Sequence, residues 1–239
     1  MASSRPTAIV LMGAPGVGKG TYASLLSKWL GYDHISTGDA IRDKIQRNAP
    51  CAAQYKQYVE KGELLPNSIV FPLVKQLIDN RECVLMDGFP RQESQIAYLD
   101  KLADVKMALW LKLKREILIE KALARRICSK CGQNYNLANI EYGTLRMPPL
   151  APKVPGICDK CEGSLYQRED DRFEIVQKRL QDFDKVTDEL VQAYDKRGVL
   201  VPFELTGGKA DMWPALQKLF IDHGFVPDKN VQSENDCLN

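Results

Sequence analysis

The sequence predicts an α/β protein with a doubly wound, parallel five-stranded sheet. Short apolar runs alternate with longer amphipathic stretches, and the first run, residues 7–12, leads directly into a glycine-rich loop. Alternating strands and helices are typical of parallel sheets that are covered by helices on both faces. Such sheets bind ligands at the carboxyl ends of their strands, and the glycine-rich loop lies at one of these ends.

The apolar runs place the strands, and the amphipathic stretches place the helices. We expect strands at residues 7–12, 34–36, 83–86, 105–111 and 199–205. Pro202 lacks an amide hydrogen, so the last strand suits an edge or strand-end position better than the sheet centre. One helix is expected to begin near Lys19, and others to cover residues 67–79, 93–102, 116–126 and 171–196.

Residues 13–21 read Gly-Ala-Pro-Gly-Val-Gly-Lys-Gly-Thr, which predicts a phosphate-binding loop. Glycines let phosphate oxygens approach the backbone, whose N–H groups converge at the positive end of the following helix, and a lysine adds a mobile charge. The general motif has Ser or Thr directly after the lysine, whereas here a glycine intervenes. The alternative is a turn that only joins a strand to a helix. The expected phosphate-binding residues are Gly16, Val17, Gly18, Lys19, Gly20 and Thr21.

Composition limits the classes of partner. The chain has 33 Lys and Arg against 31 Asp and Glu, a net charge of +2, so it lacks the global basic field of a nucleic-acid binder. No apolar run reaches the length of a membrane span, and neither a secretory signal nor a cleaved transit peptide is expected. We therefore expect a cytoplasmic protein without disulfides, with a mitochondrial location through an uncleaved signal as the alternative.

Two Cys-x-x-Cys pairs interrupt the α/β pattern and predict a separate metal-binding module at residues 127–167. The second pair follows the first after 26 intervening residues, and the segment also holds four prolines. Four thiolates are typical of a closed, tetrahedral structural zinc site. A redox pair, a catalytic zinc ion and unrelated buried cysteines are the alternatives. The loop 137–150 is expected to bulge out. The expected ligands are Cys128, Cys131, Cys158 and Cys161.

Four motifs together resemble the adenylate kinase family in its long-lid, zinc-binding form. They are the loop 13–21, Ile-Ser-Thr-Gly-Asp at 35–39, Asp-Gly-Phe-Pro-Arg at 87–91, and Leu-Tyr-Gln-Arg-Glu-Asp-Asp at 165–171. The resemblance covers about residues 7–222, and the family shows the same glycine after the lysine. It implies a monomer that uses Mg²⁺ to transfer the γ-phosphoryl group of ATP reversibly to AMP, giving two ADP.

The resemblance also implies roles for individual residues. Phosphoryl transfer needs positioned positive charge, and the implied catalytic cations are Lys19, Arg91, Arg125, Arg168 and Arg179. Asp87 and Thr21 would hold magnesium through water. Asp170 and Asp171 would pair with arginines when the site is closed. The implied ATP-binding residues add Lys121 and Arg125 to the loop, and the implied AMP-binding residues are Thr37, Arg42, Glu63, Leu64, Leu65, Gly88, Arg91, Gln95, Arg168 and Arg179.

Lys121 departs from the family pattern, which has an arginine there stacking over the donor base. Lysine keeps the charge but has no planar surface. This difference, with the extended lid loop, makes GTP:AMP phosphotransferase the alternative function. A UMP or CMP kinase is disfavoured because such kinases have short lids, and a nucleotide switch has no use for acceptor-side arginines. A zinc-ribbon nucleic-acid binder is disfavoured because the module has only four basic side chains.

The resemblance divides the chain into a discontinuous core and two flaps. The core would consist of residues 1–126 and 168–225, with an AMP-binding flap at 36–66. The zinc-binding lid would be residues 127–167, and residues 226–239 would form a polar, frayed tail.

Overall fold

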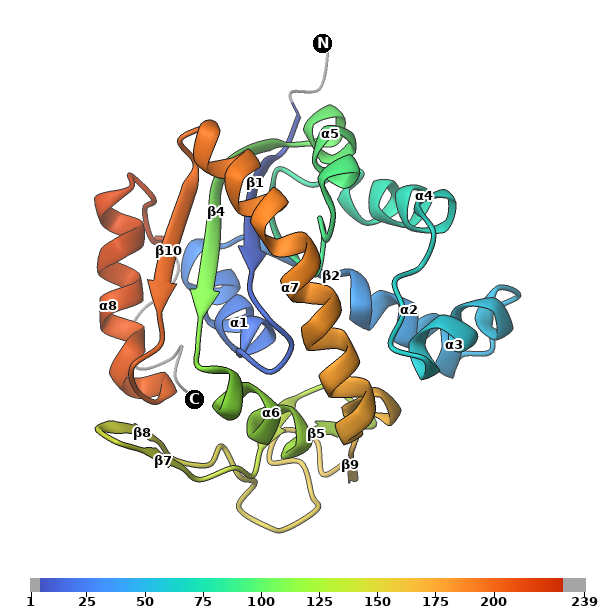
Figure 1. Ribbon diagram of the computed structural model, residues 1–239, viewed down its shortest axis with the longest axis vertical. Helices are drawn as coiled ribbons and strands as arrows, with labels where there is room; N and C mark the ends of the chain where they lie inside the picture. Colours follow the sequence, from blue (N-terminus) through green and yellow to red (C-terminus); the bar gives the residue numbers. More distant parts are fainter. Residues whose placement is uncertain (1–4, 230–239) are drawn as a thin grey trace.

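The computed structural model describes residues 5–229 of the chain. Its centre is a five-stranded sheet with the order β10-β4-β1-β3-β2, and every neighbouring pair is parallel (Figure 1). The predicted doubly wound α/β fold is confirmed. The strands are β1 (Thr7–Met12), β2 (Asp33–Ser36), β3 (Cys83–Asp87), β4 (Asp104–Lys112) and β10 (Leu200–Glu204).

β10 is an edge strand, as its proline predicts. Pro202 lies opposite Trp110 of β4, and β10 has a neighbour in the sheet on that side only. A proline without an amide hydrogen would break the hydrogen-bond ladder between two neighbours, so the edge is the position it tolerates.

Helices cover both faces of the sheet. α7 crosses its front and α1 lies behind it (Figure 1). Helix α6 ends at Leu123, so the expectation of a helix through Arg126 is wrong: Ala124 caps α6, and the next residues pair with another strand. The helices are α1 (Lys19–Leu30), α4 (Asn67–Ile78), α5 (Glu93–Leu102), α6 (Arg115–Leu123), α7 (Phe173–Lys196) and α8 (Lys209–Asp222).

The sheet is buried on both faces. Ile9 and Leu11 of β1 belong to a core cluster that also includes residues of α1 and α8. The alternate residues Ala8 and Val10 belong to a second cluster with residues of α4 and α5. Because side chains alternate along a strand, strands buried on both faces are apolar throughout, which is why they could be identified as short apolar runs.

A helical segment between β2 and α4 projects to one side of the sheet (Figure 1). It contains α2 (Thr37–Gln46) and α3 (Ala52–Glu60). Ser36 caps α2, because its hydroxyl accepts a hydrogen bond from the amide of Asp39 at 3.2 Å. The Ser-Thr-Gly-Asp sequence therefore ends β2 and starts α2 without an intervening loop.

The segment between α6 and α7 forms two small antiparallel sheets and a short helix. Three strands have the order β6-β5-β9, and β7 and β8 form a hairpin. The loop 137–150 was expected to bulge out, and this is wrong, because Ile140 and Met147 pair across the hairpin and are buried in the main core. The bounds are β5 (Arg125–Cys128), β6 (Asn134–Asn136), β7 (Ile140–Tyr142), β8 (Leu145–Met147), β9 (Leu165–Tyr166) and the 3₁₀ helix η1 (Glu169–Asp171).

The residues after α8 turn back onto α1. Phe225 contacts Phe220 with ring centroids 5.3 Å apart, and the amide of Asp228 donates to the carbonyl of Trp29 at 2.8 Å. The frayed tail expected from residue 226 on is therefore wrong for residues 226–229. The rest of that tail, residues 230–239, lies outside the described residues.

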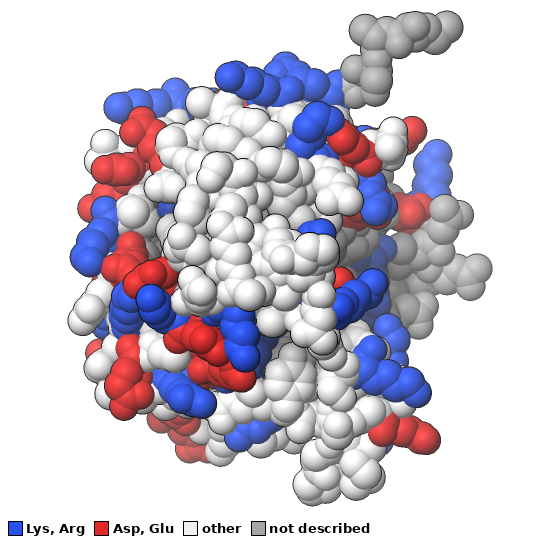
Figure 2. All heavy atoms as spheres, turned by 90° about the vertical axis from the view of Figure 1, so that its right-hand side faces the viewer, with Lys and Arg blue, Asp and Glu red and all other residues white. Residues whose placement is uncertain are grey.

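Within residues 5–229, no helix combines the length and apolar character needed to cross a membrane. The face that carries α3 and α4 shows acidic and basic side chains interspersed around a broad uncharged area (Figure 2). This face therefore has no continuous basic stripe of the kind that binds nucleic acid.

Candidate functional site

The glycine-rich loop joins β1 to α1 at the carboxyl end of the sheet. Gly16 has a φ of +86°, and a side chain there would collide with the carbonyl of Leu118. Only glycine fits both constraints. Lys19, the first residue of α1, donates through Nζ to the carbonyls of Gly13 at 2.7 Å and Ala14 at 3.1 Å. The loop thus wraps around its own lysine.

The environment of Lys19 disfavours its charge. Burial lowers the pKa of Lys19 from 10.5 to about 7. The charge of Asp87 raises this pKa, whereas repulsion from Arg91, Arg179 and Arg125 lowers it further. A bound anion would restore the charge. The loop is therefore suited to a ligand that brings negative charge to Nζ.

Asp87 is the last residue of β3 and lies opposite Leu11 of β1, beside the glycine-rich loop. Burial opposes its ionisation, but the nearby His34 ring and the charge of Lys19 outweigh burial and lower its pKa. His34 Nε2 lies 3.6 Å from the Asp87 carboxylate. Asp87 is therefore a buried carboxylate that stays ionised next to the loop.

Five arginines from separate parts of the chain gather around one pocket with Lys19 and Asp87. Three of the arginines are remote in sequence from the loop. The segment between α6 and α7 brings two of them to it, and α7 brings the third. The arginines are Arg42 in α2, Arg91 after β3, Arg125 in β5, Arg168 after β9 and Arg179 in α7.

Carboxylates hold four of these arginines in place. Asp39 accepts from Arg42 at 2.6 Å and from Arg168 at 2.8 Å. Asp170 pairs with Arg179 at 2.6 Å. Burial opposes ionisation of Asp39, but Arg42 and Arg168 outweigh it and lower its pKa.

The fourth pair joins Arg125 to the fully buried Asp171, through Arg125 Nε at 2.8 Å and a second contact from the same guanidinium. With the Asp170 pair, it bears out the expected pairing of Asp170 and Asp171 with arginines. A bidentate geometry of this kind fixes the orientation of the guanidinium plane.

One of the arginines has a buried hydrogen-bond donor that is unsatisfied within the described residues. The Nε of Arg168 is buried and makes no hydrogen bond within the described residues. Burial and the neighbouring arginines lower the pKa of both Arg168 and Arg179 to about 10, so both stay charged at neutral pH. A buried, charged donor without an acceptor is costly, and an oxyanion in the pocket would satisfy it.

A second pocket opens beside the first, under α2 and α3, and three of the same arginines line both pockets: Arg42, Arg91 and Arg179. Gln95 is almost fully buried in its wall, accepts from the Arg91 amide at 2.8 Å and donates to Asn67 at 2.9 Å. Its other lining residues include Thr37, Glu63, Leu64, Leu65, Val70 and Gly88.

Gly88 lines both pockets at the point where they meet. A side-chain carbon there would lie 3.0 Å from Arg91 and 3.1 Å from the Thr37 hydroxyl, at a φ of +82°. Arg91 Nε and Thr37 Oγ1 both donate to the Gly88 carbonyl, at 2.8 and 2.9 Å. The Gly88 carbonyl thus holds Arg91, which lines both pockets, next to Thr37, which lines the second pocket.

Comparison with known proteins identifies the family. The model of the family described as "Adenylate kinase" matches residues 11–199. This chain belongs to the adenylate kinase family. The family consists of nucleoside monophosphate kinases, which are phosphotransferases, and the resemblance deduced from the motifs is confirmed.

The relatives cover most of the chain. It is 39% identical over 224 residues to "Probable adenylate kinase 1, chloroplastic" of Oryza sativa subsp. japonica, covering 90% of this chain and 76% of that protein. It is 39% identical over 207 residues to "Adenylate kinase" of Ruminiclostridium cellulolyticum, with coverage of 83% and 92%. For "Adenylate kinase" of Clostridium tetani, the identity is 35% over 213 residues, with coverage of 86% and 94%.

The adenylate kinase motifs lead to residues that mostly converge on the two pockets. Lys19, Thr21, Asp87 and Lys121 line the first pocket with the arginines, and Gln95 lines the second. Val17 is the exception, because its side chain is fully buried in the core and lines neither pocket. Glu63 lines the second pocket from an exposed position and pairs with Lys178 at 2.9 Å.

Three neighbours of the site were not singled out from the sequence. Asp39 bridges two arginines, Asn67 fixes the amide of Gln95, and His34 contacts Asp87. Asp39 ends the Ile-Ser-Thr-Gly-Asp motif at residues 35–39, so this motif could have indicated it. Asn67 starts α4, and nothing in its local sequence distinguishes it from an ordinary helix-end residue.

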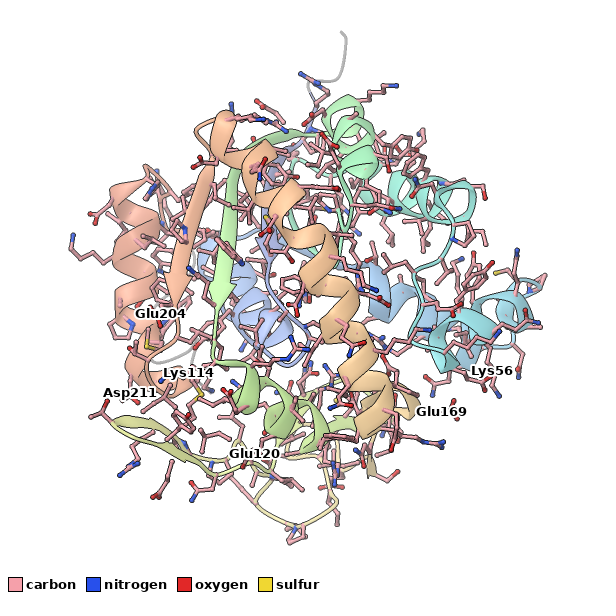
Figure 3. The ribbon with its side chains drawn as sticks, in the orientation of Figure 1. Lys56, Lys114, Glu120, Glu169, Glu204 and Asp211 are labelled. Atoms are coloured by element: carbon pink, nitrogen blue, oxygen red, sulfur yellow. The ribbon has the colours of Figure 1, made fainter. Side chains whose placement is uncertain are left out.

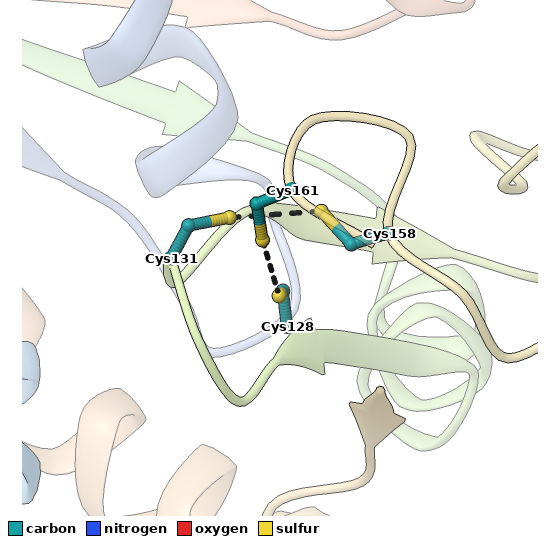
Figure 4. Close-up of side chains that lie close together, drawn as sticks. All are labelled: Cys128, Cys131, Cys158 and Cys161. Atoms are coloured by element: carbon teal, nitrogen blue, oxygen red, sulfur yellow. Dashed lines mark hydrogen bonds between the residues drawn. The ribbon is translucent and has the colours of Figure 1, made fainter. Parts of the chain in front are cut away.

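The four predicted cysteine ligands lie together at the edge of the β6-β5-β9 sheet (Figure 4). All four sulfurs lie within 4.8 Å of one another, with Cys128 and Cys161 at 3.5 Å and Cys131 and Cys158 at 3.6 Å. Thiolates at about 2.3 Å from a tetrahedral zinc ion lie roughly 3.8 Å apart, so the cluster has the size and chemistry of a zinc site.

Hydrogen bonds to Cys128 and Cys158 favour the thiolate form that a metal needs, whereas burial and the neighbouring cysteines raise the pKa of Cys131. Burial would raise the pKa of Cys158, but the Tyr135 hydroxyl and the amides of Lys160 and Cys161 lower it to about 6. The Tyr135 hydroxyl lies 3.4 Å from Cys158 Sγ and accepts from the Asp159 amide at 2.8 Å. A side chain at Gly163 would lie 2.9 Å from Cys128 Sγ, so glycine is needed for the close approach.

Proposed function

We propose that this member of the family catalyses the reversible transfer of the γ-phosphoryl group of ATP to AMP, giving two ADP. The observation that carries the proposal is the meeting of two pockets at Arg42, Arg91 and Arg179. A donor in the first pocket and an acceptor in the second would present their phosphates to the same cations. The relatives named adenylate kinase favour ATP over GTP as the donor.

The catalytic work proposed for the cations is positioning and charge neutralisation. The transferred group spreads negative charge over its oxygens in the transition state, and little covalent chemistry is asked of the protein. Planar guanidinium groups can hold two phosphate oxygens each and remain charged. We assign this role to Lys19, Arg91, Arg125, Arg168 and Arg179, because their charged ends line one pocket.

The acceptor side is proposed to hold AMP. Arg42 and Arg91 would bind its phosphate, since both line the second pocket where it meets the first. Gln95 would read the adenine edge, because its amide is oriented by Asn67 and by the Arg91 backbone. Thr37, Glu63, Leu64, Leu65 and Gly88 would complete the wall.

Magnesium would be held through water by Asp87 and Thr21, which both line the first pocket. Their oxygen atoms are the donor type that Mg²⁺ prefers, and the Asp87 carboxyl is ionised in its buried position. The ion would supply further positive charge to the phosphates. Zn²⁺ is proposed for the four cysteines, where a closed set of sulfurs suits a structural role.

Two movable parts are proposed around a fixed core. Residues 36–66 would close over AMP and residues 127–167 over ATP, while 1–126 and 168–225 form the core apart from the first flap. Closure would exclude water, which competes with AMP as the acceptor. The ion pairs of Asp170 and Asp171 stand at the end of the second part and support a hinge there.

The proposed working form is a monomer in the cytoplasm, with nucleotides as its partners. One chain supplies both pockets, and free thiols at Cys51 and Cys83 suit a reducing compartment. Sedimentation of the purified protein with and without ATP tests the first point, and fractionation of cells tests the second.

A phosphoryl-transfer assay tests the proposed function. ATP and GTP are crossed as donors with AMP, GMP, CMP and UMP as acceptors, using protein loaded with zinc. The expected result is rapid formation of ADP from ATP and AMP. Preference for GTP with AMP would instead establish the GTP:AMP alternative, and folded protein that is inactive with every pair would contradict the kinase.

A further inference from the structure

The β7–β8 hairpin, residues 138–148, is seated on the core at the end of the first pocket away from the acceptor side. Lys114 lies over the ring of Tyr142 at 4.8 Å, and Figure 3 shows Lys114 and Asp211 close to the hairpin. A side-chain carbon built at Gly208 would lie 3.0 Å from Pro148. The hairpin therefore contacts both the start of α6 and the loop before α8.

The inner side of the hairpin is apolar and lines the first pocket. Ala138, Ile140, Met147 and Pro148 contribute to the pocket wall, as do Gly207 and Gly208. None of these residues lines the second pocket. Ile140 and Met147 are 3% and 6% exposed, so they present a dry surface beside the glycine-rich loop. An apolar wall of this kind suits a flat aromatic ring.

Lys121 lies between this wall and the loop. Its Nζ is 3.7 Å from the Met147 sulfur, and a side-chain carbon built at Gly18 would lie 3.9 Å from it. A thioether is a weak acceptor. Within residues 5–229, no carboxylate lies within ion-pair distance of Nζ, in contrast to the four arginines that are paired with Asp39, Asp170 and Asp171. Burial lowers the pKa of Lys121 to about 8.

We propose that the hairpin is the base-binding wall of the donor site, and that Lys121 binds the donor's phosphates instead of its base. Ile140 and Met147 would then replace the stacking surface that a family arginine provides, while the ammonium group finds its missing anion next to Gly18. This inference rests on the proposed function and assigns a role to the lid extension, for which the sequence alone indicates none.

Equilibrium binding of two magnesium-loaded probes separates the two contacts. ATP carries both a base and phosphates, whereas inorganic tripolyphosphate carries phosphates alone and is measured by competition with ATP. Lys121→Met should raise the Kd of both probes by the same factor, about tenfold, because a charge-assisted contact is lost. Met147→Ala should raise the Kd of ATP roughly tenfold and leave that of tripolyphosphate unchanged.

Matched variants keep the test decisive. Met147→Leu keeps the apolar surface and should retain wild-type affinity for ATP, even if Met147→Ala loosens the hairpin. Arg146→Ala changes the neighbouring exposed residue, whose contacts are with Glu141 and the Gly143 carbonyl, and should change neither Kd. Melting temperatures of all four variants show which of them remain folded.

Three results would overturn the inference while the proposed function stands. Lys121→Met could weaken ATP alone, which would assign the ammonium to the base. Met147→Ala could leave the Kd of ATP unchanged in folded protein, which would remove the hairpin from the site. Tripolyphosphate could fail to compete at millimolar concentration, which would place donor affinity outside phosphate contacts. Wild-type protein that binds no ATP would contradict the proposed function itself.

Discussion

The two pockets that meet at the arginines are built in different ways. The second pocket, the proposed acceptor site, uses polar contacts that are already made, such as Gln95 with Asn67 and with the Arg91 amide. The far end of the donor-side pocket uses an apolar hairpin and a lysine without a carboxylate partner among the described residues. Hydrogen-bonded groups reject a wrong ligand more strongly than apolar walls do. The acceptor site should therefore discriminate bases more sharply than the donor site.

The largest effect is expected where the two pockets join. Arg91→Ala should lower kcat/KM by about 10³-fold or more, because an arginine on the transferred phosphates acts mainly in the transition state. KM for both nucleotides should be affected, since Arg91 lines both pockets. Arg197→Ala is the matched control, because Arg197 pairs with Asp100 and lines neither pocket. Near-normal turnover in the Arg91 variant would remove it from the catalytic group.

A change on the acceptor side should be smaller and one-sided. Gln95→Leu removes the amide that is oriented by Asn67, so KM for AMP should rise about tenfold to hundredfold. KM for ATP should stay the same, and the ratio of rates with AMP and other monophosphates should fall. Steady-state kinetics over both substrates measures this. An equal rise in both KM values would show that the two pockets are not independent.

pH should separate the pockets in another way. Burial lowers the pKa of Lys19 to about 7 and that of Lys121 to about 8, and both line the donor pocket. Donor phosphates favour the protonated forms, so ATP binding takes up protons and weakens as pH rises. Between about pH 7.5 and 8.5 the Kd of ATP should rise roughly twentyfold to thirtyfold if both lysines take up a proton.

AMP is the internal control for that experiment, because arginines and no lysine are among the described residues that line its proposed pocket, so its Kd should remain nearly constant. Calorimetry in two buffers of different ionisation enthalpy also gives the number of protons taken up with ATP. A Kd for ATP that is constant from pH 7 to 9 would contradict the lowered pKa of Lys19.

The smallest effect on turnover is expected from the cysteines, which lie outside both pockets. Cys128→Ser with Cys131→Ser should remove metal binding and destabilise the lid, lowering the melting temperature by about 4–8 °C for roughly 2 kcal/mol. Turnover at low temperature should change little, because none of the four cysteines lines either of the two pockets that meet at the arginines. Turnover that collapses at temperatures where the lid stays folded would argue for a more direct role.

The two sides also differed in how well the sequence predicted them. Acceptor-side residues lie in compact motifs that join one strand to the next helix, and each motif carries its own geometry. The donor side depends on the chain that follows α6, where a helix through Arg126 was expected. Local helix propensity favours such a continuation, but pairing of Arg125 with Asn136 and of Arg126 with Tyr135 converts the end into a strand.

The hairpin was missed for a related reason. Ile-Glu-Tyr-Gly-Thr-Leu-Arg-Met alternates apolar and polar residues around a glycine, which is a hairpin signal. Gly143 has the positive φ, +63°, that such turns use. The proline-rich surroundings hid this pattern. The pairing of Asn67 with Gln95 had no local signal, because it joins the first turns of two different helices.

The carboxylates that hold the arginines have a consequence for release of product. Asp39, Asp170 and Asp171 occupy donors on guanidinium groups that the proposed mechanism assigns to phosphates. Each arriving phosphate therefore exchanges one anionic partner for another instead of meeting a bare cation, and the net gain in binding free energy is moderate. These three carboxylates thus compete with the phosphates for the same guanidinium groups. A catalyst that must let go of two highly charged products in every cycle gains speed from such competition, because departure is often the slow step.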